Sequence, residues 1–585
     1  LHTATDPGGA TTTWTLDALG RPRTIQDPDS GTTKLEHDGF GELVTSTDAL
    51  GRIAKFDVDE LGRVTTRTDK LGAQTLATTT WVWDSAPHGI GRLHTVASPD
   101  AVQSYSYTAK GQLEGMGQTV EGESFAARQW YDDVGRVKAI DYPQPLGIEP
   151  FGVAYEHDEH GFVIGVREKN TDELFWTLAE VDDAGRIQKE TFGNGVETTR
   201  EYDHNKQTLA AISTTFGAKS IQSLTYDWDS RLNLKSRTDA GQPQNKTERF
   251  RYDELDRVTC AYFGAFENSN APCETSFSYK ADGNLWEKSD VGTYSYSDQK
   301  HPHAVTHVPG ETFFYDAVGN QITRPGGVSI TYTPFDLPKT ITKGGKTTTF
   351  GYDADQQRIR KTSPTSETIY FGEIFEQVTS AAGVERRFYV HSPERAIAVF
   401  TFGGNNPGTR FLHVDHLGSI DVVTKKDGTI AERRSYDAFG AQRNPEWGGP
   451  SVPLTNRTTR GFTGHEEDDE FGLINMKGRI MDPRLGRFTT TDPVIADIWN
   501  GQTLNRYSYV NGNPLAFVDP TGFVTTTLPD TYCCIEETVK VDYPDGFVPE
   551  PPIQEDDYII TNHAANIGAY VAPVDVGTTG SGGDG

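Results

Sequence analysis

Two Asp-Pro pairs lie ten residues apart near the end of the chain, Asp482-Pro483 and Asp492-Pro493, and Arg479 precedes the first pair by three residues. Two carboxyl groups held close together cannot both ionise cheaply, so the pKa of one rises and the pair shares a proton. One member can then act as a base towards water, and the other as an acid towards a carbonyl or a leaving amide. An arginine beside them can orient one carboxylate through paired hydrogen bonds. These residue types predict hydrolytic chemistry.

The position of this segment suggests what it acts on. The segment GRIMDPRLGRFTTTDP, residues 478–493, lies between a long series of short repeats and a C-terminal stretch of different composition. A chemical device at such a boundary suggests a site that acts on the chain itself. Asp-Pro is also common in β-turns, however, so each Asp taken alone is more often a turn residue.

The elements that must position these residues are predicted to be short strands. The chain of 585 residues holds 60 Gly, 24 Tyr and 29 Phe but only 3 Met. Glycine-rich turns separated by aromatic and β-branched residues indicate many short strands, and no window shows a sustained helical stripe. The length exceeds one ordinary core, which favours several domains or a repeat architecture.

A short phrase recurs through most of the chain, as in VDELGRVTTR at Asp59 and YDELDRVTCAY at Asp253. An aromatic residue ends a strand, the Asp bonds turn amides, a Gly two or three places later allows positive φ, and Arg with an aliphatic residue starts the next strand. Each unit therefore predicts a β-hairpin, with Arg stacked on rings of neighbouring strands. Such units must pair with their neighbours to bury an apolar face. We assign the repeated Asp to Asp17, Asp38, Asp59, Asp132, Asp183, Asp203, Asp227, Asp253, Asp316 and Asp353.

These phrases resemble the YD repeats of the RHS family, which includes bacterial rearrangement-hot-spot proteins, C subunits of Tc toxin complexes, wall-associated bacterial toxins and animal teneurins. The resemblance covers nearly all of residues 10–523. It is sharper in residues 410–443, which resemble the DHLGS segment and its YDxxG turn. Residues 460–497 resemble the RHS-associated core, and residues 504–523 resemble the closing phrase of the family.

The resemblance implies an all-β fold in which one long, spiralling antiparallel sheet of YD-repeat hairpins forms a hollow shell, or cocoon. It implies three parts: a shell over residues 1–409, an inward-folded RHS-associated core plug over 410–523, and a variable effector remnant or tail over 524–585. The repeat spacing alone would predict only an array of hairpins.

The resemblance also implies a self-cleaving aspartic protease that acts once, on its own chain. By motif match, Asp482 and Asp492 occupy the paired acidic positions and Arg479 the basic position. The phrase DPTGF places the cut after Phe523, releasing Val524 onward. Asp519, Pro520 and Gly522 are assigned to the turn that presents this bond. Arg479 is alternatively a structural ion pair.

The expected partner is the chain's own C-terminal effector segment inside the shell. A Tc-type B subunit and a type VI secretion spike are the two further candidates, with export from a bacterium. The alternative function is a non-catalytic cell-surface adhesion or scaffold shell, with carbohydrate binding as a weaker third interpretation. The start of the chain lacks Met and enters in mid-pattern, so we expect it to be a piece of a longer polypeptide.

The composition argues against several classes of partner. The net charge of −29 opposes a nucleic-acid-binding surface, and no apolar run is long enough to span a membrane. We expect no cofactor and no metal. Cys260 and Cys273 form either a loop disulfide or two free thiols, and adjacent Cys533 and Cys534 lack zinc-site spacing.

Three histidines and an acidic run lie outside the main motif. His413, His416 and His465 are interpreted as solvated or turn-bonding residues rather than as a metal or catalytic site. The acidic run 466–470 is interpreted as a solvated hairpin tip because it lacks a calcium-loop pattern.

Overall fold

The Asp of a repeat organises a tight turn through its carboxylate, and in several repeats both oxygens take part. In the computed structural model, which describes residues 2–143, 151–241, 246–264, 266–446 and 458–527, Asp59 shows the pattern. Its Oδ1 accepts hydrogen bonds from the amides of Leu61 (2.9 Å) and Arg63 (3.0 Å), and its Oδ2 accepts one from Arg63 Nε (2.7 Å). Gly62 completes the turn with a φ of 79°, which an L-residue with a side chain adopts only at a cost. The repeated Asp-x-x-Gly-Arg phrase is therefore one turn motif.

Aromatic residues link each turn to its neighbour, as the sequence predicts. The guanidinium of Arg186 lies 4.0 Å from the ring centre of Tyr202, and that of Arg257 lies 4.5 Å from Tyr279. The hydroxyl of Tyr279 donates a hydrogen bond to the carbonyl of Val258 (2.9 Å), just after the arginine of the preceding repeat. Ring, cation and hydroxyl thus bind successive hairpins together.

Two of the predicted repeat positions are wrong. Asp182, not Asp183, accepts the turn amides of Ala184 and Arg186, at 3.0 and 2.9 Å. In the YDWDSR phrase the turn is organised by Asp229, whose Oδ1 accepts the amide of Arg231 at 2.8 Å, while Asp227 still belongs to the strand. In both phrases two Asp residues lie close together, and only one of them accepts the turn amides.

The strands form a meander in which each strand pairs antiparallel with the next. The first sheet has 26 strands: β1 (Thr3–Thr5), β2 (Thr11–Leu16), β3 (Pro22–Asp27), β4 (Gly31–His37), β5 (Leu43–Thr47), β6 (Arg52–Val58), β7 (Val64–Leu71), β8 (Gln74–Trp83), β9 (Leu93–Ala97), β10 (Val102–Tyr107), β11 (Leu113–Val120), β12 (Glu123–Tyr131), β13 (Val137–Asp141), β14 (Gly152–His157), β15 (Val163–Glu168), β16 (Leu174–Val181), β17 (Ile187–Phe192), β18 (Val196–Tyr202), β19 (Leu209–Phe216), β20 (Lys219–Trp228), β21 (Leu234–Asp239), β22 (Lys246–Tyr252), β23 (Val258–Phe263), β24 (Thr275–Tyr279), β25 (Leu285–Lys288) and β26 (Gly292–Thr293).

A two-stranded ribbon and a second large sheet follow. The ribbon is β27 (His307–Val308) with β28 (Glu311–Thr312). The second sheet has 13 strands: β29 (Phe314–Tyr315), β30 (Gln321–Arg324), β31 (Val328–Tyr332), β32 (Pro338–Lys343), β33 (Lys346–Tyr352), β34 (Arg358–Thr362), β35 (Ser366–Phe371), β36 (Phe375–Ser380), β37 (Gly383–His391), β38 (Ala396–Gly403), β39 (Gly408–Val414), β40 (Ile420–Lys425) and β41 (Ile430–Arg433).

A small sheet of four short strands closes the described chain: β42 (Glu466–Asp468), β43 (Leu473–Asn475), β44 (Ile480–Asp482) and β45 (Arg487–Phe488). Two 3-10 turns, η1 (Phe462–Gly464) and η2 (Val510–Gly512), flank it. We call residues 458–527 the plug. No α-helix occurs among the described residues, so none is present there that could cross a membrane.

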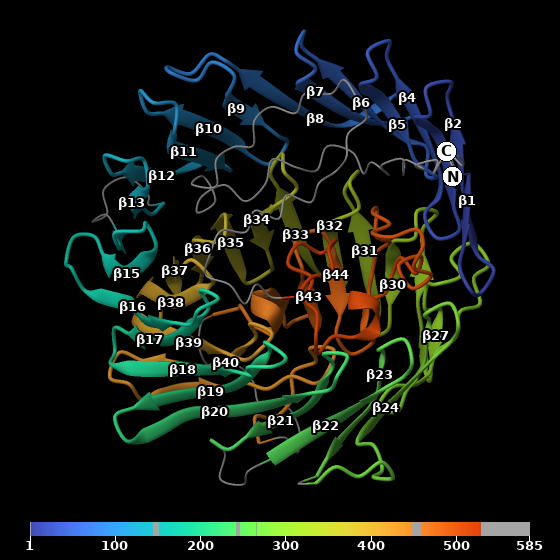
Figure 1. Ribbon diagram of the computed structural model, residues 1–585. Helices are drawn as coiled ribbons and strands as arrows, with labels where there is room; N and C mark the ends of the chain where they lie inside the picture. The colour runs from blue at the N-terminus through green and yellow to red at the C-terminus, as the bar shows by residue number, and fades with distance from the viewer. Residues whose placement is uncertain (1, 144–150, 242–245, 265, 447–457, 528–585) are drawn as a thin grey trace, which may run out of the picture.

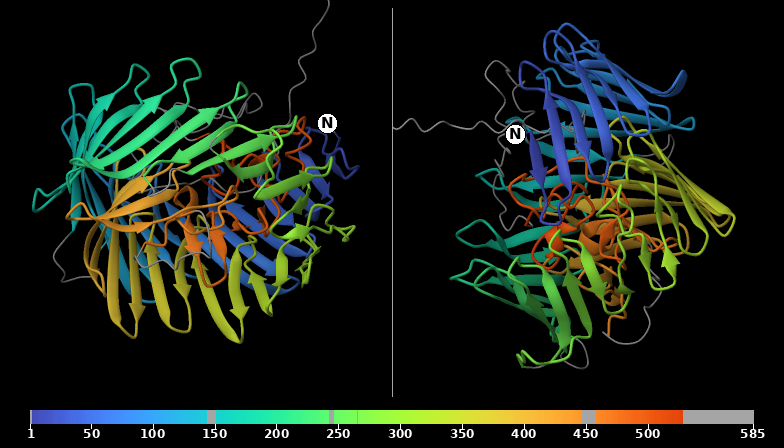
Figure 2. Two further views of the ribbon diagram at one scale, coloured as in Figure 1. Left: turned by 90° about the horizontal axis from the view of Figure 1, so that it is seen from below. Right: turned by 90° about the vertical axis from the view of Figure 1, so that its right-hand side faces the viewer.

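The two large sheets surround the plug. In Figure 1 the strands of the first sheet run around the periphery, and β43 and β44 lie near the centre. In the view from below, strands of the first and second sheets form opposite walls, with the orange and red C-terminal segments between them (Figure 2). The predicted all-β shell with an inward-folded plug is confirmed, although the shell consists of two long sheets rather than one. The predicted boundary after residue 409 falls inside β39, and the second sheet continues to Arg433.

Apolar side chains fix the plug to both sheets. One cluster packs Met481 and Phe488 of the plug with Phe250 and Phe277 of the first sheet, and another packs Ile480 with Ile330 of the second. A smaller cluster joins Trp14 of β2 to plug residues Ile495 and Leu504. Burying these side chains gives the plug a defined position against strands from both ends of the shell.

Of the two alternatives for Cys260 and Cys273, a disulfide or two free thiols, the structure contains the disulfide. Cys260 of β23 and Cys273 form a disulfide with a Cα–Cα distance of 5.5 Å, which closes the loop between β23 and β24. Cys533 and Cys534 lie outside the described residues.

Candidate active site

Arg479 lies at the centre of a buried group of ionisable residues. Its Nη2 is 2.9 Å from Oδ2 of Asp492 and 3.2 Å from Oδ2 of Asp519. Arg479 immediately precedes β44, Asp492 follows β45, and Asp519 lies near the end of the plug. The fold thus brings two carboxylates, 27 positions apart by residue number, to one nitrogen atom.

The other contacts of Arg479 hold its guanidinium in one orientation. The group lies 3.5 Å from the ring centre of Phe488, and Nη1 donates a hydrogen bond to the carbonyl of Arg506 (3.2 Å). Nε donates to the carbonyl of Gly522. Because Arg479 is 3% exposed, these contacts replace hydration of a buried cation.

The two carboxyl groups have raised pKa values. Burial raises the pKa of Asp492 to about 6 against the opposing effect of Arg479, and the nearby Asp519 contributes to the rise. Burial also raises the pKa of Asp519, although Arg479 and backbone amides lower it in part. A pair of this kind can hold one proton near neutral pH, which is the condition for combined acid and base chemistry.

The segment 519–524 is wrapped around this pair. Oδ1 of Asp519 accepts a hydrogen bond from the amide of Val524 (2.9 Å). The amide of Gly478 donates to the carbonyl of Thr521 (2.9 Å). A Cβ placed on Gly478 would lie 2.2 Å from the ring of Phe523, so that ring packs directly on the glycine. The Phe523–Val524 bond is therefore held beside the carboxyl of Asp519.

Neighbouring backbone contacts complete the turn. Val518 and Thr526 exchange two backbone hydrogen bonds of 2.8 and 2.9 Å, so the chain forms a narrow loop between them. Gly522 has a φ of 82°, and Pro520 is exposed on the turn. These residues, with Asp519 and Phe523, match the predicted turn around the DPTGF phrase.

Comparisons with known proteins agree with the repeat structure. The family model described as RHS Repeat matches residues 17–53. Toxin subunit YenC2 of Yersinia entomophaga is 25% identical over 433 residues, which cover 58% of this chain and 42% of that protein. The double-stranded DNA deaminase toxin A of Burkholderia cenocepacia is 24% identical over 469 residues, covering 66% of this chain and 31% of the toxin. Together these matches support an RHS/YD-repeat family protein.

Other relatives of this RHS-repeat chain are much longer than it is. The tRNA nuclease WapA of Bacillus subtilis (strain 168) is 27% identical over 229 residues, which cover 37% of this chain and 9% of WapA. Among solved structures, the crystal structure of TcdB2-TccC3 aligns with a TM-score of 0.74 at 17% identity, covering 87% of this chain and 29% of that one. That likeness concerns the fold, and it is the fold of the Tc toxin shell.

Asp482 does not join the pair in this RHS-repeat structure. Its Oδ2 lies 2.6 Å from Nη2 of Arg324 in the second sheet, and its Oδ1 accepts the amide of Leu485 (3.0 Å) at the turn that ends β44. The structure therefore brings Arg479 and Asp492 together as predicted, but it places Asp519 in the position expected for Asp482. The signal that could have found Asp519 is in the sequence, because Asp519-Pro520 is a third Asp-Pro pair just before the predicted cut.

The interpretation of the histidines as solvated or turn-bonding is half right: the solvated part is wrong, whereas His465 does bond to a turn. His413 and His465 are buried, and burial lowers the pKa of each to about 3. Burial also lowers the pKa of His416, to about 4. Nε2 of His465 lies 2.9 Å from the carbonyl oxygen of Asp519, and this hydrogen bond stabilises the turn. Neutral imidazoles in these positions serve as packing and hydrogen-bonding groups.

The interpretation of the run 466–470 as a solvated hairpin tip is half wrong. Asp469 and Glu470 are exposed, whereas Glu466, Glu467 and Asp468 are buried in β42. Arg358 of β34 lies 3.0 Å from both Glu466 and Asp468. These carboxylates join the plug to the second sheet. Within the described ranges, no group of three or more His, Cys, Asp or Glu residues is arranged to hold a metal ion.

Proposed function

We propose that this chain is the shell of a bacterial toxin that cuts its own backbone after Phe523 and so releases the segment beginning at Val524. The observation that carries the proposal is the single nitrogen of Arg479 shared by the partly buried carboxyl of Asp492 and the buried carboxyl of Asp519. Asp519 also accepts the amide of Val524, which is the nitrogen that would leave. The substrate is thus a bond already held at the pair.

The hydrolysis follows from these positions. The carboxylate of Asp492, whose side chain is 17% exposed, takes a proton from water, and the water oxygen bonds to the carbonyl carbon of Phe523. The carboxylic acid of Asp519 gives its proton to the nitrogen of Val524 as the C–N bond breaks. The products are a carboxyl group on Phe523 and an amine on Val524, with the proton left on Asp492 and Asp519 ionised.

Arg479 and the turn supply positioning in this scheme. The guanidinium stabilises the ionised member of the pair, while Nε on the carbonyl of Gly522 fixes the chain next to the bond that breaks. Because the bond belongs to the same chain, the reaction needs no binding step and occurs once per molecule.

Intact mass and a denaturing gel test the cut. The wild-type chain should separate into fragments ending at Phe523 and beginning at Val524, whereas Asp492→Asn should remain whole. A folded wild-type chain that stays uncut would contradict self-cleavage. An uncut chain that also bound an external ligand would favour the adhesion alternative.

Encapsulation is the second part of the proposal. The plug packs against strands of both sheets and lies between them (Figure 1), which supports a segment after Val524 that begins inside the shell. A passenger held there cannot meet its targets or aggregate before release. After cleavage, residues 524–585 should elute with the shell in native size exclusion and resist added protease. Separation of the fragment under native conditions would contradict retention.

The partner proposal rests on the fold. The structures that resemble this chain include that of TcdB2-TccC3, whose name joins two components. We therefore propose that a Tc-type B subunit completes this shell for export from the bacterium, with a type VI secretion spike as the competing route. Co-expression with each candidate followed by size exclusion separates these two routes.

A further inference from the structure

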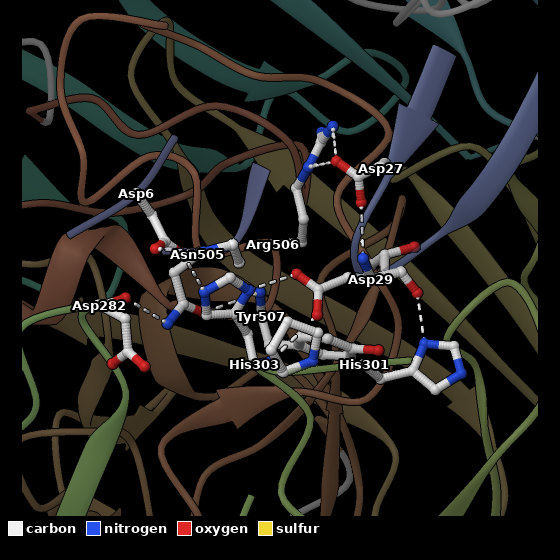
Figure 3. A network of polar contacts seen from close by, with 12 residues as sticks. Asp6, Asp27, Asp29, Asp282, His301, His303, Asn505, Arg506 and Tyr507 are labelled. Carbon is white, nitrogen blue, oxygen red and sulfur yellow. Dashed lines mark hydrogen bonds and ion pairs between the residues drawn. The ribbon is translucent and has the colours of Figure 1, made fainter. Parts of the chain in front are cut away.

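Arg506 of the plug is bound by an aspartate from the start of the chain. Its Nη2 and Nε donate to Oδ2 of Asp27, at 2.8 and 3.1 Å, across a sequence separation of 479 residues (Figure 3). The side chains are 5% and 2% exposed. Breaking a buried pair of this kind leaves one charge without compensation, so each residue depends on the other.

The same arginine touches the candidate active site three times. Its Nη1 donates to the carbonyl of Asp492 (2.9 Å), and its own carbonyl accepts the amide of Asp492 (2.9 Å). That carbonyl also accepts a hydrogen bond from Nη1 of Arg479 (3.2 Å). Arg506 therefore bonds to both the amide and the carbonyl of Asp492, and it also bonds to Nη1 of Arg479. None of these contacts is to the Phe523–Val524 bond.

Asp27 is itself fixed by the turn between β3 and β4. Its Oδ1 accepts the amides of Asp29 (2.9 Å) and Ser30 (3.0 Å), and its Oδ2 accepts the hydroxyl of Thr12 (2.9 Å). The carboxylate can point at Arg506 only when this turn is formed and lies against the plug.

A second buried contact joins the same turn to the loop between β26 and β27. His303 lies between Asp29 (2.5 Å from Nδ1) and Asp6 (2.7 Å from Nε2), as Figure 3 shows. Burial lowers the pKa of His303, but the two carboxylates outweigh it and raise that pKa to about 9. The imidazolium therefore joins the first strands of the shell to a segment nearly 300 residues later.

We infer that Arg506 is a positioning residue for Asp492 and Arg479, and that Asp27 must hold it, so that the site is complete only when the β3–β4 turn has docked on the plug. This inference rests on the proposed self-cleavage. Its consequence is an order of events: the chain is cut after the first strands have closed onto the plug, and a passenger is not released from an open shell.

The test compares rates of cleavage in the full chain. Each precursor is isolated uncut in urea and refolded by dilution, tryptophan fluorescence follows folding, and a denaturing gel follows the cut. We expect Asp27→Asn and Arg506→Gln to slow cleavage at least about tenfold after folding is complete, because small misplacements of reacting groups are costly. Arg506→Lys keeps a cation for Asp27 but cannot reach Asp492 as well, so it should also be slow.

The matched control is Asp468→Asn. Asp468 is equally buried and pairs with Arg358 of the shell, at 3.0 Å, but contacts neither Asp492 nor Arg479. It should fold less stably and cut at the wild-type rate once folded. A similar slowing in Asp468→Asn would show that general loss of shell–plug packing is responsible, and would overturn the inference.

A pH profile separates positioning from loss of structure. Arg506 lowers the pKa of Asp492, as Arg479 does, whereas burial and Asp519 raise it. In Arg506→Gln the acid limb of the cleavage rate should therefore move to higher pH than in Arg506→Lys. Cleavage at the wild-type rate in both Asp27→Asn and Arg506→Lys would refute this inference but not the proposed function. If Asp27→Asn does not fold, the cleavage rate of Arg506→Lys is the deciding measurement. An uncut wild type would instead refute the proposed function and this inference with it.

Discussion

The backbone amide of Val524 donates a hydrogen bond to Oδ1 of Asp519, 2.9 Å away, while Oδ2 of the same carboxylate lies 3.2 Å from Arg479. The YD turns use the same device, since the Oδ1 of each repeat Asp accepts downstream amides and the Oδ2 of Asp59 accepts an arginine. At Asp519 the turn differs because it is buried and a second carboxylate, that of Asp492, reaches the arginine as well. A common structural turn thereby acquires the residues that the proposed hydrolysis requires.

Substitutions of Asp482 and Asp519, which both precede proline in the plug, should separate the two possible pairs. We expect Asp519→Asn to abolish cleavage, because the amide cannot supply the proton for the leaving nitrogen. Asp482→Asn should leave the cut intact but reduce the free energy of unfolding by about 3 kcal/mol, because Arg324 loses its buried partner. Intact mass measures the first effect and urea unfolding the second. An Asp482→Asn chain that folds but is not cleaved would instead support Asp482 and Asp492 as the catalytic pair, as the sequence predicts.

Cleavage should slow on acidification. Burial raises the pKa of Asp492 to about 6, so lowering the pH through that value protonates the carboxylate that must accept a proton from water. The rate should therefore fall as the pH drops below about 6 and should be restored as the pH rises again. Refolded precursor, sampled on gels across a pH series, gives the profile. A rate that increases through this range would exchange the roles of Asp492 and Asp519.

The loop around Gly522 should tolerate no side chain. A Cβ there would lie 2.4 Å from the carbonyl of Met476, and φ is 82°. Gly522→Ala should slow cleavage by on the order of 10²-fold, since the bond moves relative to the carboxyls. Gly472→Ala is the control, because its φ is 66° with no atom within 4 Å of the added Cβ. Both should cost about 1–2 kcal/mol of backbone strain, and only the first should affect the cut.

The disulfide should contribute stability without affecting cleavage. The bond between Cys260 and Cys273 spans 13 residues, and closing a loop of that size stabilises a protein by about 3 kcal/mol. Replacing both cysteines by Ser should lower the urea midpoint, as should a reducing agent, with unchanged cleavage. An unaltered midpoint in both cases would indicate that the pair adds nothing to stability.

Local sequence was sufficient to predict the shell's building unit. Aspartate, glycine and arginine at fixed spacing determine the turn because their contacts lie within four residues of one another, as at Asp59 and Arg63. The contacts between arginine and tyrosine of successive repeats were also predictable, since these residues recur with the turns. Where two Asp residues stood close together, as at Asp182 and Asp183, the pattern could not select the one in the turn.

Identifying the candidate catalytic pair required the tertiary structure. The sequence identified Arg479 and Asp492 through their shared phrase, but Asp482 and Asp519 are both aspartates before proline, and their local sequences do not distinguish their roles. Asp482 forms an ion pair with Arg324 of the second sheet, whereas Asp519 forms one with Arg479. Likewise, the contact of Arg506 with Asp27 joins residues 479 positions apart. Such contacts depend on how the sheets close around the plug, and no local pattern encodes that closure.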